Sequence, residues 1–246
     1  MRLFDRDRRG VALTDAGLVL LREAGPALDA MAAAARRAQR AGRPQRALVL
    51  ATKAGASHEI LQRLLGAVEA APEAPATEVV LCEVGEQAVM LRDGRADIAI
   101  MHRPVDDLSG LDDEELFGEG QVAIVPAAHP LSSRASVTMD EISNVPDLPM
   151  ARWPRIDGSY PAGPGPEVRT QSQIAQLVAL GKTLLVIPAS SRAWQWPEHV
   201  AIPVTDAPEI TTVIAWPAHI RSREIAAVVR TATNLAGVPA LVPASA

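Results

Sequence analysis

The sequence predicts an α/β protein, and three observations support this fold class. Between residues 46 and 101, short apolar runs alternate with amphipathic runs and no hairpin turn separates them. This alternation is expected when strands and helices surround a parallel sheet. Hydrophobic residues make up 48% of the 246 residues, which is enough for a substantial core in one or two domains. A long amphipathic run at 14–40 precedes the alternation and predicts a separate helix.

The first stretch, residues 2–17, predicts a basic hairpin followed by a helix start. Four arginines crowd the stretch around Gly10, a residue suited to a turn, and Thr14 is a good N-cap for the next helix. The tip of such a hairpin could contact phosphates. A solvated, charged tail is the alternative, because terminal charge runs are often disordered.

The predicted helix at 14–40 has small and apolar residues at alternating intervals of three and four. This spacing forms a seam that favours pairing with another helix, although packing on its own domain is an alternative. Pro26 interrupts the pattern, since proline removes a helix hydrogen bond. The sequence Gly42-Arg43-Pro44 ends the helix and marks a domain boundary. The seam comprises Leu21, Ala24, Leu28, Met31, Ala35 and Ala38.

The remaining elements follow in order. We expect strands at 47–52, 77–84, 96–101 and 121–126, with helices at 57–70 and 87–93. A second lobe then begins with a short helix at 138–142, where Thr138 and Glu141 form a capping box. Strands are expected at 147–153, 167–170, 184–188, 200–204 and 211–216, with helices at 172–180 and 222–236. A Pro- and Gly-rich loop occupies 154–166, and residues 240–246 read as a loose tail.

Several segments resemble LysR-type transcriptional regulators. Leu-Phe-Asp-Arg at 3–6 and Arg-Gly-Val-Ala-Leu-Thr-Asp-Ala-Gly at 9–17 are similar to the wing and helix start of that family. Gly-Arg-Ala-Asp-Ile-Ala-Ile at 94–100, Val-Pro-Ala-Ala-His-Pro-Leu at 125–131 and Leu-Gly-Lys-Thr-Leu-Leu-Val-Ile-Pro at 180–188 resemble its effector domain. The resemblance implies a two-lobed effector domain of periplasmic-binding-protein type 2, preceded by a winged-helix remnant and a long linker helix.

The resemblance also implies a division of the chain. Residues 1–13 would be the wing, 14–43 the linker and dimerisation helix, 46–118 with 212–238 lobe I, and 119–211 lobe II. We expect the chain to lack the helix-turn-helix that precedes the wing in this family. The expected protein is a cytoplasmic homodimer or homotetramer that binds DNA in its full-length form. A solute-binding protein of the same fold is the alternative.

The cleft between the lobes is the expected effector site, because ligands of open α/β sheets bind beyond the carboxyl ends of the strands. The ends at 52–57, 102–103 and 170–172 should meet there. The family's contact positions map by resemblance onto Lys53, Ala54, Gly55, Arg103, Thr170 and Gln171. Lysine is rare in the chain: Lys53 and Lys182 stand against 22 arginines. Lys53 with Arg103 would favour a small carboxylate or phosphate, although Lys53 could instead point to solvent.

Charge agrees with a role near nucleic acid. Residues 1–46 hold ten arginines against five acidic residues, so this segment is +5 and the remainder of the −5 chain is −10. A basic head on an acidic body suits DNA binding, and the resemblance assigns backbone contacts to Arg6, Arg8 and Arg9 of the wing. A plain basic tail would have the same charge.

Enzyme and cofactor motifs are absent from the sequence. It contains no Gly-x-Ser-x-Gly elbow and no P-loop, and the five histidines stand singly. One cysteine, Cys82, excludes an internal disulfide and fits a reducing cytosol. We therefore expect no catalysis, no cofactor and no metal site. Trp153 and Tyr160 flank the Pro/Gly loop and could cover the cleft. Packing of both side chains on the surface of the second lobe is the alternative.

Overall fold

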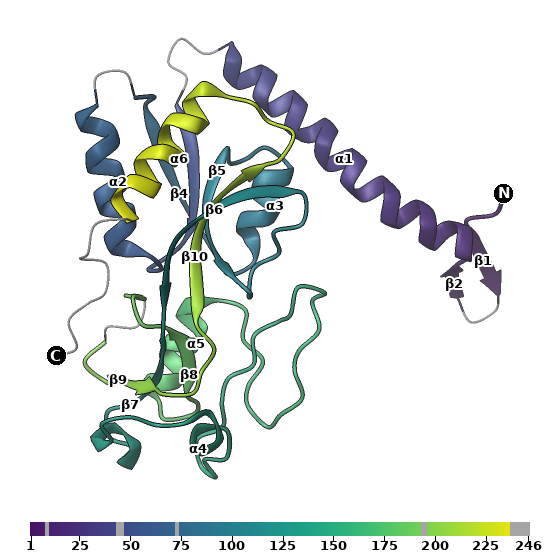
Figure 1. Cartoon of the computed structure of the whole chain (residues 1–246). Helices are drawn as coiled ribbons and strands as arrows, with labels where there is room; N and C mark the ends of the chain where they lie inside the picture. Colours follow the sequence, from purple (N-terminus) through teal and green to yellow (C-terminus); the bar gives the residue numbers. More distant parts are fainter. Residues whose placement is uncertain (8–9, 43–46, 72–73, 193–195, 237–246) are drawn as a thin grey trace.

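The computed structural model describes residues 1–7, 10–42, 47–71, 74–192 and 196–236. It contains an α/β body and a long helix that leads away from the body to a small hairpin (Figure 1). The predicted α/β fold class is therefore confirmed. The predictions for Arg8, Arg9 and the tail at 240–246 fall outside the described residues.

The N-terminal hairpin packs directly on the first turn of the long helix. Strands β1 (Phe4–Asp7) and β2 (Gly10–Leu13) pair antiparallel, and α1 (Asp15–Ala41) follows. The hydroxyl of Thr14 accepts a hydrogen bond from the Gly17 N–H at 3.0 Å, which confirms the predicted N-cap. A Cβ on Gly17 would lie 2.1 Å from the carbonyl oxygen of Leu3, so a side chain at this position would separate the hairpin from α1.

Most of the apolar seam on α1 is exposed. Leu21, Leu28 and Met31 are 63%, 64% and 71% exposed. The helix continues through Pro26 and contacts the body near its C-terminal end, where Ala33 is buried. Packing on the same chain therefore accounts for only a short part of the seam, and pairing with a second chain stays a prediction.

The larger lobe, called lobe I here, is a five-stranded mixed sheet in the order β4-β3-β5-β10-β6 with three helices. The predicted parallel pairing is confirmed for β3 with β4 and with β5. Strand β10 runs antiparallel between β5 and β6. The elements are β3 (Leu48–Lys53), α2 (His58–Ala70), β4 (Thr77–Cys82), α3 (Glu86–Arg92), β5 (Ile98–Arg103), β6 (Leu111–Glu119), β10 (Ile210–Pro217) and α6 (Arg223–Ala236).

Lobe I buries apolar side chains on both faces of its sheet. On one face, Leu50 and Ile100 pack with residues of α2 and α6, such as Leu64 and Val228. On the other face, Ala99 packs with residues of α3. Because successive side chains of a strand point to opposite faces, near-continuous apolar runs such as β3 and β5 supply both cores.

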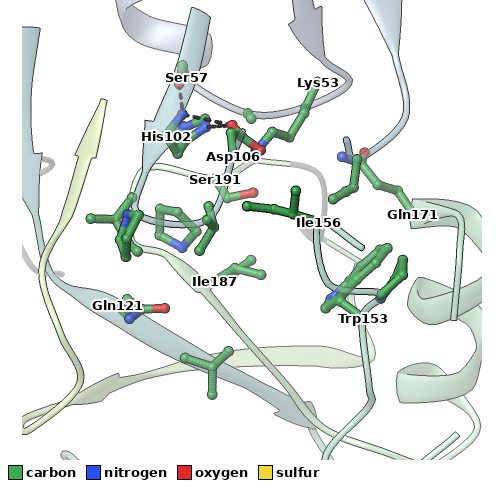
Figure 2. Close-up of a pocket in the computed structure, with 18 of the residues that line it drawn as sticks. Lys53, Ser57, His102, Asp106, Gln121, Trp153, Ile156, Gln171, Ile187 and Ser191 are labelled. Atoms are coloured by element: carbon green, nitrogen blue, oxygen red, sulfur yellow. Dashed lines mark hydrogen bonds and ion pairs between the residues drawn. The ribbon is translucent and has the colours of Figure 1, made fainter. Parts of the chain in front are cut away.

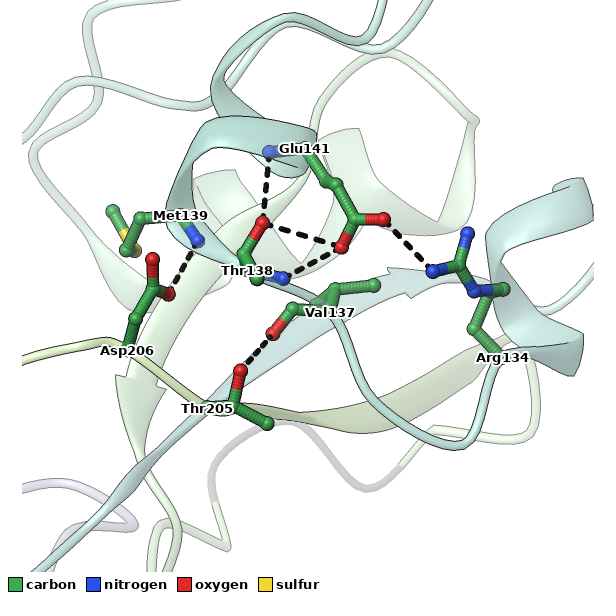
Figure 3. Close-up of polar contacts among 7 residues, drawn as sticks. All are labelled: Arg134, Val137, Thr138, Met139, Glu141, Thr205 and Asp206. Carbon is green, nitrogen blue, oxygen red and sulfur yellow. Dashed lines mark hydrogen bonds and ion pairs between the residues drawn. The ribbon is translucent and has the colours of Figure 1, made fainter.

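The smaller lobe, called lobe II here, is built on the antiparallel sheet β8-β7-β9. The capping box of α4 is confirmed: Thr138 and Glu141 exchange hydrogen bonds between side chain and backbone (Figure 3). A carboxylate oxygen of Asp206 accepts a hydrogen bond from the Met139 N–H at 2.6 Å and ties α4 to the turn after β9 (Figure 3). The elements are β7 (Gln121–Pro126), the 3-10 turn η1 (Pro130–Ser133), α4 (Met139–Ser143), α5 (Gln171–Ala179), β8 (Leu185–Pro188) and β9 (His199–Val204).

Two predicted strands of lobe II are wrong. Residues 147–153 and 167–170 form single bridges instead, with Met150 opposite Leu184 and Arg152 opposite Glu167. The apolar pattern of 147–153 is real, but the prolines at both of its ends cannot donate ladder hydrogen bonds. The segment is therefore irregular chain, in which Leu148 and Ala151 are buried.

Two extended connections join the lobes. Strand β6 leads through Gly120 into β7, and β9 leads through residues 205–209 into β10 (Figure 1). The crossings lie near Gln121 and Thr211. In the described part of the chain two segments cross between the lobes, so the width of the cleft depends on the backbone at these two points.

Candidate functional site

A cavity of about 720 Å³ lies between the lobes. Its size falls within the range of small-molecule sites, roughly 300–1,000 Å³. Most of its wall is apolar and comes from both lobes, including Val84 of lobe I and Trp153, Ile156 and Ile187 of lobe II (Figure 2). The cavity can therefore enclose a ligand with a substantial apolar body.

The polar end of the cavity is a cluster of four side chains of lobe I (Figure 2). The Lys53 Nζ lies 2.9 Å from Asp106 Oδ2. The Ser57 hydroxyl lies 3.1 Å from His102 Nε2, and His102 Nδ1 lies 3.6 Å from Asp106 Oδ2. All four residues are buried, with exposed fractions of 8% or less.

Local backbone geometry explains how these side chains meet. Lys53 ends β3 and His102 lies near the end of β5, and the two strands are parallel neighbours, so both side chains reach the same sheet edge. Asp106 is held in the loop after β5, where its carboxylate accepts a hydrogen bond from the His102 N–H at 2.8 Å. Ser57 precedes α2 with a φ of 51°, a left-handed conformation that is unusual for serine. Its hydroxyl makes no capping bond to α2 and is directed to His102 instead.

Burial and charge set the protonation of this cluster. Burial by itself would raise the pKa of Asp106, but the hydrogen bond with His102 and the charge of Lys53 lower it to about 2. Burial lowers the pKa of His102, and Asp106 offsets this effect only in part. At neutral pH the cluster therefore holds an ionised Asp106 and a neutral His102.

The structure brings two of the six expected effector residues into the cavity wall. Lys53 and Gln171 line it, whereas Ala54, Gly55 and Thr170 do not. The Gly55 carbonyl oxygen instead accepts a hydrogen bond from the Arg192 N–H at 2.8 Å. Thr170 caps α5 by accepting a hydrogen bond from the Gln173 N–H at 3.2 Å.

Arg103 does not line the cavity. Its guanidinium lies 3.0 Å from a carboxylate oxygen of Asp113 and 3.8 Å from one of Glu115, both on β6. Neighbouring residues of a strand point to opposite faces, so the orientation that aims His102 at the cluster turns Arg103 away from it. The structure thus separates the two cations that the sequence analysis combined.

Several lining residues are not apparent from the sequence. Asp106 is the main one, and its only signal is its position four residues after His102, in the loop that leaves β5. Trp153 lines the cavity as the sequence analysis allowed, but Tyr160 does not, and its hydroxyl oxygen instead accepts a hydrogen bond from Arg169 at 3.1 Å. Arg155 and Asp157 are exposed and lie at the lobe II side of the wall.

Besides the backbone hydrogen bond between Arg192 and Gly55, two contacts of acidic side chains bridge the lobes beside the cavity. A carboxylate oxygen of Glu83, in the turn after β4, accepts a hydrogen bond from the Gln171 N–H at 3.0 Å, at the N-terminus of α5. The Arg192 guanidinium of lobe II forms an ion pair with Glu59 of α2. Glu83 therefore occupies a helix N-terminus that could otherwise receive an anion.

The described part of the chain holds no group of three or more His, Cys, Asp or Glu residues placed to bind a metal ion. None of the helices within the described ranges has the length and apolar content that crossing a lipid bilayer requires.

Comparisons with known proteins agree with this architecture. A family model for the LysR substrate binding domain matches residues 41–236. The Hca operon transcriptional activator HcaR of Escherichia coli (strain K12) is 26% identical over 232 residues, which cover 87% of this chain and 76% of that protein. The HTH-type transcriptional regulator AlsR of Bacillus subtilis (strain 168) is 26% identical over 204 residues, which cover 77% of this chain and 67% of that protein.

Solved structures show the same fold. The oxidized form of OxyR from Corynebacterium glutamicum matches with a TM-score of 0.59 and 21% identity, over 96% of this chain and 80% of that chain. The predicted two-lobed arrangement of periplasmic-binding-protein type 2 is thus confirmed.

Proposed function

Because the chain belongs to the LysR-type family of transcriptional regulators, we propose that it is the effector-sensing part of such a regulator and senses a small organic anion. The effector would occupy the cavity between the lobes and favour one lobe arrangement over others. The relatives are transcriptional regulators, which supports a regulatory role, a cytoplasmic location and the absence of an enzymatic one.

The observation that carries the anionic class is the buried ammonium of Lys53. An ammonium has three N–H donors, and the contact with Asp106 at 2.9 Å uses one of them. The remaining donors can face the cavity that Lys53 lines. A carboxylate at this end would also lie near the N-terminus of α2, which favours negative charge.

The apolar wall supports a ligand with an apolar body. Side chains such as Trp153, Ile156 and Ile187 surround the space beyond the polar cluster. A carboxylate with an aromatic or alkyl body would place its charge at Lys53 and its body against this wall. Benzoate, 2-naphthoate and octanoate sample this class at increasing size.

The test is a titration of these three acids and their matched primary amides, followed by isothermal calorimetry and by tryptophan fluorescence, to which Trp153 of the cavity wall contributes. We expect the acids to bind more tightly than the amides. Lys53→Met should weaken acid binding at least tenfold, since it removes a charge-assisted hydrogen bond worth about 1.5–3 kcal/mol. Lys182→Met, at an exposed lysine, is the matched control and should bind like the wild type.

Two outcomes would contradict the proposal. Equal affinity for acids and amides would show that the site does not recognise charge. Equal affinity of the wild type and of a folded Lys53→Met variant would remove Lys53 from the site. Circular dichroism of each variant establishes that it is folded.

The N-terminal segment would connect sensing to DNA. We propose that the exposed face of α1, with Leu21, Leu28 and Met31, pairs with a second subunit, and that Arg6 of the hairpin contacts the DNA backbone in the full-length regulator. Leu28→Glu should lower the oligomeric state seen in analytical ultracentrifugation. An unchanged oligomer would place the subunit contact elsewhere.

A further inference from the structure

The fixed charges at the polar end of the cavity cancel before any ligand arrives. Lys53 and Asp106 carry opposite charges 2.9 Å apart, and both are buried. A carboxylate placed against Lys53 would bring the cluster to a net charge of −1. An uncompensated charge is costly in a buried site, so anion binding here favours the arrival of one positive charge.

The hydrogen bonds of His102 show where this charge can be held. Its Nε2 lies 3.1 Å from the Ser57 hydroxyl, while its Nδ1 is buried, has no hydrogen-bond partner among the described residues and lies 3.6 Å from Asp106 Oδ2. A neutral imidazole carries one N–H, and the nearby carboxylate favours that proton on Nδ1. The Ser57 hydroxyl then donates to Nε2 and cannot donate into the cavity.

Protonation of His102 reverses the direction of this hydrogen bond. Both ring nitrogens become donors, so Nδ1–H faces Asp106 and Nε2–H is donated to the oxygen of Ser57. The Ser57 hydroxyl proton is then released to point toward a carboxylate in the cavity, which Ser57 lines. A single proton thus supplies the missing charge and a further donor for the ligand.

Other ionisable groups of the described residues near the cluster do not supply that charge. Lys53 of β3 is already a cation and Asp106 is an anion with a pKa of about 2. Cys82 of β4, on the other side of Lys53, is a neutral thiol because burial raises its pKa to about 12. From lobe II, Arg155 and Asp157 lie exposed at the wall and contribute one group of each sign.

We propose that an anionic effector binds to this cavity together with one proton, and that His102 takes up the proton while Ser57 turns its hydroxyl from His102 to the effector. This inference rests on the proposed function, since it requires that the effector is an anion. It makes His102 a specificity-determining residue, because a neutral ligand would recruit no proton.

Calorimetry measures the proton directly. Binding of benzoate, 2-naphthoate and octanoate is titrated at pH 7.5 in triethanolamine and in Tris, two cationic buffers whose ionisation enthalpies differ, so the difference in binding enthalpy gives the number of protons taken up. We expect an uptake approaching one proton per bound acid and none for a bound amide. The dissociation constant should rise by up to roughly tenfold per pH unit between pH 6.5 and 8.5, because the bound state holds more protons than the free state.

Variants identify the group. His102→Gln keeps a side chain that can reach Ser57 but cannot titrate, so its proton uptake and its pH dependence should disappear. His219→Gln, at an exposed histidine of lobe I, should keep both. If His102→Gln does not fold, NMR of the imidazole of His102 in the wild type replaces it, and the ring should change from neutral to protonated when the acid is added at pH 7.5.

The outcomes separate this inference from the proposed function. Acid binding without proton uptake, or an uptake that persists in folded His102→Gln, overturns the inference and leaves the anion sensor intact. Failure of all three acids to bind overturns both. Uptake that is lost in His102→Gln and retained in His219→Gln supports the inference.

Discussion

The joint between α1 and lobe I offers a sharp test of how the helix is held. Gly94 follows α3 with a φ of +77°, and a Cβ built on it would lie 2.7 Å from the Cα and 3.0 Å from the Cβ of Ala33 on α1. Nearby, the Arg36 guanidinium donates a hydrogen bond to the carbonyl oxygen of Asp93 at 2.6 Å. The substitution Gly94→Ala should therefore push α1 away from the body.

The magnitude has two parts. A left-handed backbone costs a non-glycine residue about 1–2 kcal/mol, and overpacking against a backbone atom costs about 1–3 kcal/mol. Together they predict that Gly94→Ala lowers the free energy of unfolding by about 2–5 kcal/mol. Gly181→Ala is the matched control, because Gly181 has a φ of +67° but nothing within 4 Å of its Cβ position. Gly181→Ala should lower the free energy of unfolding only by the cost of the left-handed backbone, about 1–2 kcal/mol.

Urea denaturation of both variants gives the free energies of unfolding, and hydrogen exchange followed by mass spectrometry reports on α1 itself. We expect residues 30–38 to exchange faster in Gly94→Ala than in Gly181→Ala. Equal unfolding free energies within about 0.5 kcal/mol, with equal exchange in α1, would refute the reasoning that Gly94 is required for a close contact with Ala33.

Three further predictions concern the cleft and its surroundings. The pKa of Asp106 is lowered from 3.8 to about 2 in the folded state, so its ionised form stabilises the fold above pH 4 by about 2 kcal/mol. This contribution is lost as the pH falls toward 2, and unfolding free energies measured down that range should fall more steeply for wild type than for Asp106→Asn. Glu83→Gln should speed hydrogen exchange of the Gln171 amide roughly twofold to fivefold, because the carboxylate charge that accepts its hydrogen bond is worth about 0.5–1 kcal/mol. NMR measures this exchange rate, and Glu78→Gln, at an exposed position of β4, is the control. An equal increase in both variants would contradict the prediction. Cys82 should resist thiol reagents at pH 8 until urea unfolds the protein, since burial raises its pKa to about 12, and rapid labelling of the native protein would be the contrary result.

The candidate site shows how far strand ends can be located without the fold. Lys53 and Gln171 were placed at the cavity by the family resemblance, and both line it: Lys53 ends β3 and Gln171 begins α5. Arg103 was placed at the correct strand end but on the wrong face. No sequence pattern predicted that Asp106 joins the site, because its position depends on the path of the loop after β5.

The sequence by itself determined most of the elements, with the strands predicted at 147–153 and 167–170 as exceptions. Periodicity and capping are local properties of the chain, so the capping box of α4 and the parallel core strands were predicted from neighbouring residues. The tertiary structure decided which side chains meet. The contact of Glu83 with the Gln171 amide joins residues 88 positions apart across two lobes, and the cluster at Lys53 needs two strands, a helix start and a loop at once. Such contacts depend on how the elements are placed relative to one another. Long-range packing determines this placement, and the local sequence pattern does not predict it.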